Sequence, residues 1–173
     1  MDIKTLQLKY LDLIKDRFTV EKNEEDYFIK LSVSKNLQIL KDIIHFWRVN
    51  GVNDFCPVTS ALLKKLGSFD MKINSYYKNN NFSNYIEEFG RSFLLYVTKD
   101  ENKLISFVAE FELTMNKVKS GCDKDFFIET RYNIYEVFDF IIHDKEMPAE
   151  KEESFLIKVS SSIENNFCIV HKN

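Results

Sequence analysis

Glycine and proline, the residues that most often interrupt helices and strands, are scarce in this chain, with 4 Gly and 2 Pro among 173 residues. No internal repeat and no low-complexity linker separates one part of the chain from another. Its length falls within the usual range for one domain. We therefore expect a single domain, 1–173, built from long regular elements.

Apolar residues recur every three or four positions through most of the first 121 residues, which is the spacing of amphipathic helices. The pattern is clearest at 101–118, where Leu104, Phe107 and Phe111 belong to a stripe that we expect to be buried. The same spacing predicts further helices at 2–16, at 34–50 with a stop at Asn50–Gly51, at 57–66, at 69–77, and from a cap at Ser83 or Asn84 to Val97.

Residues 27–33 alternate between two faces instead, which predicts a strand. After residue 122 we expect an extended segment at 126–128, a short helix at 134–141, a loop at 144–153, and a hairpin of 155–159 with 167–170. The predicted fold is mainly α within the α+β class. It consists of a bundle of five to six helices at 1–121, with the strand at 27–33, and an α/β portion at 122–173 with a small antiparallel β element.

The charge and composition exclude some functions. Lys and Arg total 24 against 27 Asp and Glu, and no basic block resembles a nucleic-acid-binding surface. No signal peptide and no apolar run of about 20 residues is present, so we expect a cytoplasmic protein that does not enter membranes. The three cysteines, Cys56, Cys122 and Cys168, are odd in number and far apart, which favours free thiols.

The sequence lacks a Gly-rich phosphate loop, a Gly-x-Ser-x-Gly elbow and a Cys-x-x-Cys pair, so it favours a binding protein over an enzyme. Glu110 and Glu112 diverge by about 200° around a helix axis, and we expect both carboxylates on solvated faces. Two alternatives remain open: a stand-alone protein-interaction module, and a small metal-dependent enzyme that uses Asp42, His45, Asp139 and His143.

A more specific indication comes from motifs in a fixed order between residues 33 and 172. They are Phe55-Cys56-Pro57, Leu62 to Phe69 with Leu66-Gly67, Tyr76-Tyr77, Phe89-Gly90-Arg91-Ser92-Phe93, an acidic helix at 107–112, Arg131-Tyr132-Asn133-Ile134, and the strand at 155–159. This order resembles the partner-protein family of multinuclear non-heme iron-dependent oxidative enzymes in ribosomal peptide biosynthesis. The chain departs from the family pattern at Asn133, where many members have Pro, and at Cys56, which precedes Pro57.

The segment 28–34 and the Cys56-Pro57 pair are also similar to the methanobactin branch of that family. The resemblance implies a non-catalytic subunit that forms a heterodimer with the iron enzyme and recruits the leader of a precursor peptide. The peptide's cysteines would become oxazolone and thioamide groups in a copper-binding product. The iron would belong to the partner enzyme, and this chain would carry no cofactor of its own.

A short sheet leaves unpaired backbone groups at its edge, which an extended peptide can satisfy by adding a strand. We therefore expect the strand at 154–160 to be the recognition edge, with a peptide-binding surface formed by Phe155, Ile157, Lys158, Val159, Phe167 and Ile169. At the interface with the partner enzyme we expect Arg131, Tyr132 and Tyr135.

Overall fold

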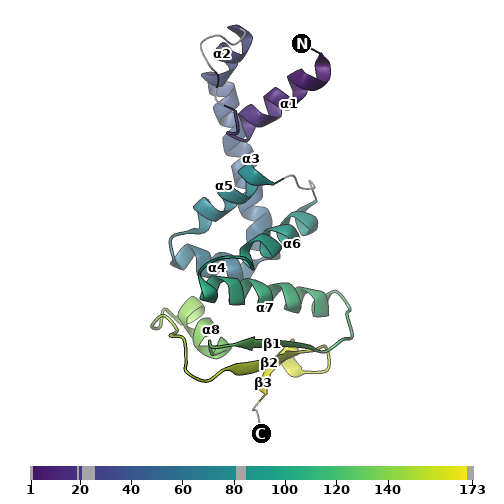
Figure 1. Cartoon of the computed structure of the whole chain (residues 1–173), viewed down its shortest axis with the longest axis vertical. Helices are drawn as coiled ribbons and strands as arrows, with labels where there is room; N and C mark the ends of the chain where they lie inside the picture. Colours follow the sequence, from purple (N-terminus) through teal and green to yellow (C-terminus); the bar gives the residue numbers. More distant parts are fainter. Residues whose placement is uncertain (1, 19, 21–25, 81–84, 171–173) are drawn as a thin grey trace.

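The computed structural model describes residues 2–18, 20, 26–80 and 85–170. The molecule is elongated, with α1–α3 at one end, α4–α7 in the middle, and a three-stranded sheet with α8 at the other end (Figure 1). The elements are α1 (Ile3–Ile14), α2 (Asp26–Ser32), α3 (Lys35–Phe55), α4 (Pro57–Lys65), α5 (Phe69–Asn79), α6 (Ile86–Val97), α7 (Lys103–Lys119), β1 (Phe126–Thr130), α8 (Ile134–His143), β2 (Phe155–Val159), the 3-10 turn η1 (Glu164–Asn166) and β3 (Phe167–Val170). The predicted mainly helical α+β fold is confirmed, with seven helices before residue 122 in the described part of the chain. The predicted caps Ser83 and Asn84 lie outside the described residues.

The predicted strand at 27–33 is wrong, because these residues form helix α2. A strand would have buried Tyr27 and Val33 together on one face, yet both side chains are exposed. Phe28 is fully buried instead and packs in a small cluster with Leu13 of α1 and Leu37 of α3. These contacts between separate helices outweigh the local alternation.

Helix α3 continues past the predicted stop at Asn50–Gly51 and ends at Phe55. Gly51 and Val52 are buried inside the helix, so packing offsets the low helix propensity of glycine. The break comes at Cys56, which leaves the helical region because the ring of Pro57 disfavours helical backbone at the preceding residue. Pro57 then occupies the first turn of α4, where its missing N–H costs little.

Helix α7 is the centre of the core. It packs against α4 and α6 on one side and against β1 and β2 on the other, so it lies between the helices and the sheet (Figure 1). The predicted stripe is buried at Leu104, Phe107 and Phe111, and the ring of Phe111 meets Phe167 of β3 edge-on at 5.1 Å between centroids. One hydrophobic cluster therefore joins the helices to the sheet.

The sheet has the antiparallel order β1-β2-β3. The predicted hairpin of β2 and β3 is present, and β1 adds a strand on the other side of β2, with Ile128 opposite Ile157. Strand β2 is therefore central, and its backbone pairs on both sides. The expectation that residues 154–160 offer a free edge is wrong, since the two edges of the sheet are β1 and β3.

Candidate functional site

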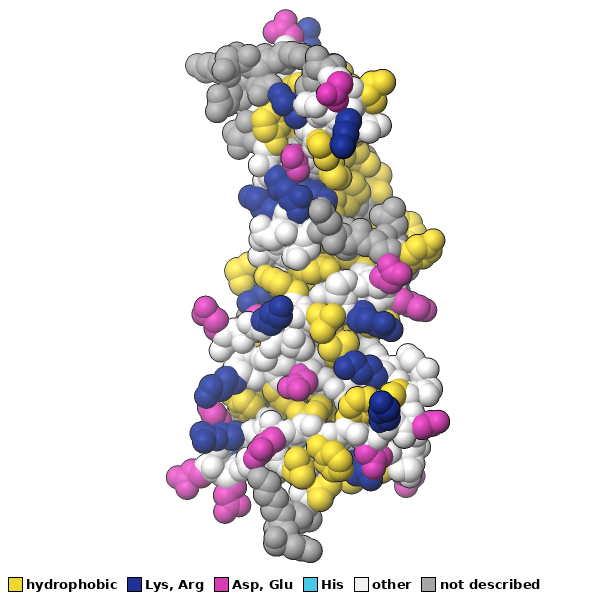
Figure 2. Space-filling view, turned by 45° about the vertical axis from the view of Figure 1, so that its right-hand side comes forward, with side chains coloured by type: hydrophobic (Ala, Val, Ile, Leu, Met, Phe, Trp, Pro, Cys, Tyr) yellow, Lys and Arg dark blue, Asp and Glu magenta, His cyan; other side chains and the backbone are white. Residues whose placement is uncertain are grey.

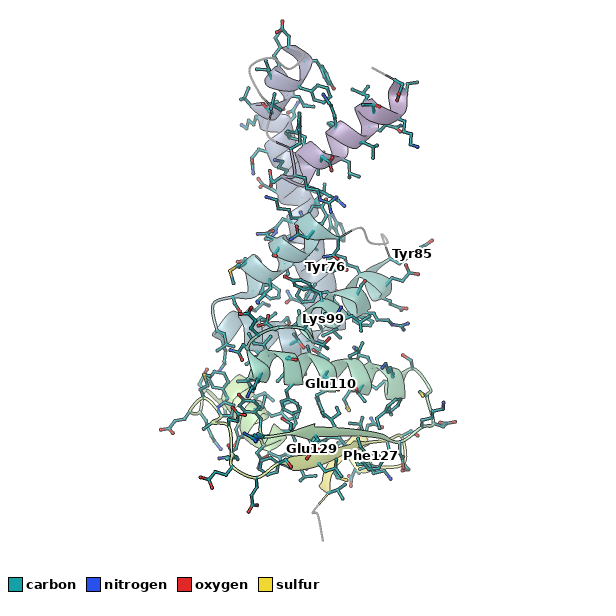
Figure 3. The ribbon with its side chains drawn as sticks, viewed as in Figure 1. Tyr76, Tyr85, Lys99, Glu110, Phe127 and Glu129 are labelled. Atoms are coloured by element: carbon teal, nitrogen blue, oxygen red, sulfur yellow. The ribbon has the colours of Figure 1, made fainter. Side chains whose placement is uncertain are left out.

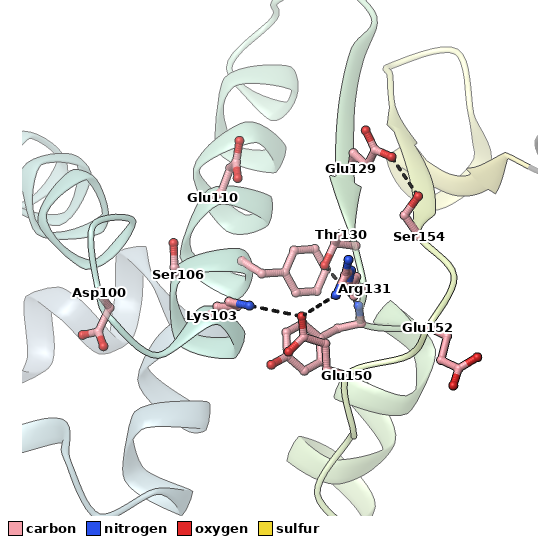
Figure 4. A pocket seen from close by; sticks show the side chains of 12 residues that line it. Asp100, Lys103, Ser106, Glu110, Glu129, Thr130, Arg131, Glu150, Glu152 and Ser154 are labelled. Atoms are coloured by element: carbon pink, nitrogen blue, oxygen red, sulfur yellow. Dashed lines mark hydrogen bonds and ion pairs between the residues drawn. The ribbon is translucent and has the colours of Figure 1, made fainter.

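A groove lies between the N-terminal half of α7 and the free side of β1, with a volume of about 500 Å³. Figure 3 shows Glu110 on α7 and, on the strand below it, Phe127 and Glu129. The loop that leads into β2 closes one end of the groove (Figure 4). The lining residues are Asp100, Lys103, Ser106, Phe107, Glu110, Glu129, Thr130, Arg131, Tyr132, Glu150, Glu152 and Ser154.

The hydrogen-bond pattern of the sheet tells which backbone groups of β1 face outward. In antiparallel pairs, directly opposed residues alternate between bonded and non-bonded pairs. Ser160 donates its N–H to the carbonyl of Asn166, so β2 uses its even-numbered residues to bond β3 and its odd-numbered residues to bond β1. It follows that the N–H and C=O groups of Phe127 and Glu129 point away from the sheet.

The end of β1 is held in place by an ionic contact across the groove. The carboxylate of Glu150 lies 3.3 Å from the amine of Lys103 on α7 and 3.6 Å from the guanidinium of Arg131 after β1 (Figure 4). The ring of Tyr132 stacks on Phe107 of α7 with 6.2 Å between centroids. Burial, followed by the nearby charge of Glu150, raises the pKa of Tyr132. These contacts join the helix, the strand and the loop at one end of the groove.

Acidic groups dominate the lining. Five carboxylates, from Asp100, Glu110, Glu129, Glu150 and Glu152, face two cations, Lys103 and Arg131. Asp100 is already paired with Lys72 outside the groove, and Glu150 is shared between the two cations. Glu110 and Glu152 are exposed. The groove therefore favours a ligand that carries positive charge.

The structure separates the residues predicted to bind peptide. Ile157 and Val159 are fully buried, and Phe167 packs against Phe111, Tyr135 and Phe138, so these side chains belong to the core. Phe155 and Ile169 are half-buried.

Lys158 pairs with Asp125 at 2.7 Å on the outer face of the sheet. Because β2 is the central strand, the backbone of 155–159 has no free edge to offer a peptide. The expected edge-strand geometry of 155–159 is therefore wrong, and the edges of the sheet are β1 and β3, the latter of which contains Phe167 and Ile169.

Two of the three predicted interface residues, Arg131 and Tyr132, line the groove, whereas Tyr135 is exposed on α8 beside Phe167. The carboxylates of the groove come from three separate segments, and sequence periodicity does not group them. Glu110 is exposed as expected. Glu112 is not: its side chain is buried at 3% exposure, which corrects the expectation of a solvated face.

The residues of the alternative metal site are held in two separate places. Asp42 accepts a hydrogen bond from Gln38, and His45 lies 3.6 Å from Asp70 of α5. On α8, Asp139 pairs with Lys145. In the described part of the chain, no three His, Cys, Asp or Glu side chains lie close enough together to hold a metal ion. The geometry therefore gives this alternative no support.

None of the described helices combines the length and apolar character needed to cross a bilayer. Comparisons with protein-family models, with curated proteins and with solved structures found no match for this chain.

Proposed function

We propose that this protein is the non-catalytic partner subunit of a multinuclear iron-dependent oxidative enzyme and holds the leader of a ribosomally made precursor peptide. The observation that carries the proposal is the free edge of β1 beside the acidic groove. An extended leader would add a fourth strand next to β1, with its backbone bonded to the outward N–H and C=O of Phe127. Its cationic side chains would meet the carboxylates of the groove.

Strand addition suits a leader peptide because backbone bonds give affinity without demanding one sequence, while side-chain contacts give selectivity. Each added hydrogen bond contributes about 0.5–1.5 kcal/mol net. The groove beside β1 can receive only those leader side chains that point toward α7. Such binding would fix the register of the leader and so the position of the cysteines that follow it.

The family resemblance supports the same role. Two groups of its motif residues have defined positions in the structure: Arg131 and Tyr132 line the groove, and Phe55 to Pro57 join α3 to α4. The oxidation would take place on the partner's iron, and the products would be oxazolone and thioamide groups of a methanobactin-like copper-binding peptide. This chain would contribute binding and orientation only.

The test requires a precursor peptide and a multinuclear iron-dependent enzyme, for which the genes that neighbour this one are searched. Phe127→Pro removes an outward N–H of β1 and leaves the bonds to β2 in place, whereas Phe127→Ala keeps the N–H and removes the exposed ring. In fluorescence anisotropy with a labelled leader, the proline variant should bind about 2- to 10-fold more weakly than the alanine variant.

Two results would contradict the proposal. Equal leader affinity of the two folded variants would exclude β1 as the binding edge. If the co-expressed iron enzyme and this protein eluted separately in size-exclusion chromatography, the role of partner subunit would be wrong. Circular dichroism confirms that each variant is folded before its affinity is interpreted.

A further inference from the structure

Helix α3 exposes an apolar stripe that no element of the described chain covers. Ile39, Ile43, Phe46 and Trp47 are 46%, 48%, 59% and 65% exposed. They follow the spacing i, i+4, i+7 and i+8, which places them on one face of the helix. In Figure 1 the helix runs along the far side of the molecule, behind α1 and α5, and Figure 2 shows hydrophobic side chains at the surface of this upper half.

The free face extends over almost the whole helix. At about 100° per residue, Lys35, Ile39, Ile43, Phe46, Asn50 and Asp54 fall within an arc of about 100°. All six are exposed or half-buried. The 21 residues of α3 correspond to a length of about 31 Å. A partner helix of equal length could therefore lie along the entire face.

The face is complementary to a second copy of itself placed in the opposite direction. When a second α3 lies antiparallel, with the two-fold axis between Ile44 and His45, Ile43 of one copy lies opposite Phe46 of the other. Ile39 then lies opposite Asn50, and Lys35 lies opposite Asp54. The apolar side chains meet at the centre, and opposite charges meet at both ends, which is the usual arrangement of an apolar interface core inside a polar rim.

The two charges at the ends of this face oppose the dipole of their own helix. Lys35 is in the first turn of α3 and Asp54 in its last turn, which is the reverse of what the helix dipole favours. Neither side chain forms an ion pair with another described residue. A second copy of the chain would supply the missing partner to each of them.

We propose that two copies of this protein associate through antiparallel α3 helices, with Ile43 and Phe46 at the centre of the interface. A two-fold contact of this kind closes on itself, so it gives a dimer and not a filament. The dimer leaves the β1 edge free, because the groove and the α3 face lie on different elements. The inference does not depend on the proposed peptide-binding function.

The first test uses sedimentation velocity over a range of concentrations. Trp47 is the single tryptophan of the chain and belongs to the stripe, so its emission should shift to shorter wavelength as the dimer forms. Ile43→Glu should weaken association about 30-fold or more, because it places two charges at the centre of the interface. Ile142→Glu, at an exposed isoleucine on α8, should leave association unchanged.

The second test reverses the end charges. Lys35→Glu and Asp54→Lys should each weaken the dimer about 3- to 10-fold at low salt. An equimolar mixture of the two variants should recover wild-type association, because every facing pair is then opposite in charge. Both substitutions favour the helix dipole, so weaker association cannot come from a frayed helix.

Three outcomes would overturn the proposal. The first is a protein that stays monomeric at every concentration. The second is a mixture of the charge variants that associates no better than each variant alone. The third is an Ile43→Glu protein that dimerises as strongly as the wild type, since the stripe would then not form the interface.

Discussion

The carboxylate of Glu112 on α7 accepts the backbone N–H of Thr59 at 2.7 Å, across 53 positions of sequence. Its other oxygen accepts the N–H of Val58 at 2.8 Å. Both donors belong to the first turn of α4, whose N-cap residue, Cys56, makes no side-chain cap bond. A buried carboxylate on a distant helix thus replaces the local cap that most helices have.

Replacing Glu112 by Ala should therefore destabilise the protein. The two N–H groups would lose their acceptor inside the core, and unsatisfied buried donors are costly. We expect a loss of about 2–4 kcal/mol in the free energy of unfolding, measured by urea denaturation. Glu110→Ala, two positions away on the exposed face of α7, is the matched control and should change stability by less than about 0.5 kcal/mol. Equal stability of the two variants would show that Glu112 does not cap α4.

The titration of Glu112 gives a second prediction. Burial raises the pKa of this carboxyl above its usual value of 4.5, although the bonds from α4 oppose the shift. The folded state therefore takes up a proton more readily than the unfolded state. The stability contributed by this group is greatest at low pH and falls as pH rises from 4.5 through the folded pKa.

The pH effect should be read as a difference between wild type and Glu112→Gln, which cannot titrate at this position. Exposed carboxyls with lowered pKa, such as Asp125 and Asp144, contribute with the opposite sign but are common to both proteins. The stability of wild type relative to the Gln variant should decline as pH rises through the folded pKa. A difference that stays constant with pH would mean that the pKa of Glu112 is the same in both states.

A third prediction concerns Gly90 of α6, which lies against Phe55 at the end of α3. A Cβ at residue 90 would clash with the Cβ and the ring of Phe55. Alanine favours a helix over glycine by about 0.5–1 kcal/mol, but overpacking costs about 1–3 kcal/mol. Gly90→Ala should thus lower the free energy of unfolding. The same change in a Phe55→Gly background, which removes the Cβ as well as the ring of residue 55, should cost less, and equal costs in the two backgrounds would contradict the contact.

The thiols provide a fourth prediction. Cys56 is buried and donates its S–H to the carbonyl of Gly90 at 3.4 Å. Burial, together with the charge of Glu112, raises its pKa, so little thiolate forms. With Ellman's reagent on native protein, Cys122 and Cys168, which are half-buried, should react well before Cys56. A Cys56→Ser variant should show the same fast phase as wild type, and a smaller fast phase would mean that Cys56 is accessible.

The spacing of apolar residues along the sequence predicts the buried stripe of α7, but it predicts neither helix α2 nor the burial of Glu112. The stripe of α7 was predictable because every member lies within a few turns of one helix. Helix α2 was not, because Phe28 is placed by Leu13 and Leu37, which belong to other helices. Glu112 is buried because its carboxylate accepts hydrogen bonds from the first turn of another helix, α4. The spacing of residues around position 112 does not indicate this contact.

The groove was missed for a related reason. The extended character of 126–128 was predictable, but its place beside β2 depends on pairs such as Phe126 with Val159. Without that pairing, the sequence pattern predicts β2 as an edge strand. The carboxylates of the groove come together only after β1, α7 and the 144–153 loop have packed.

The last prediction concerns the charge of the groove. If the leader bound along β1 is cationic, a reversed charge at Glu110 should weaken its binding, because an exposed carboxylate on the wall of the groove becomes an exposed amine. The effect of one solvent-exposed charge is modest, about 2- to 5-fold in Kd. It should shrink as the salt concentration rises from about 0.05 M to about 0.5 M, because screening shortens the range of the interaction.

Glu101→Lys is the control for Glu110→Lys. It makes the same charge change at an exposed residue that does not line the groove. Anisotropy with a labelled leader compares the two variants at each salt concentration. A weaker affinity in Glu110→Lys alone, which returns to wild type at high salt, would place the cationic peptide beside α7. Equal losses in both variants would mean that only the net charge of the protein matters, and the groove would then have no special part in recognition.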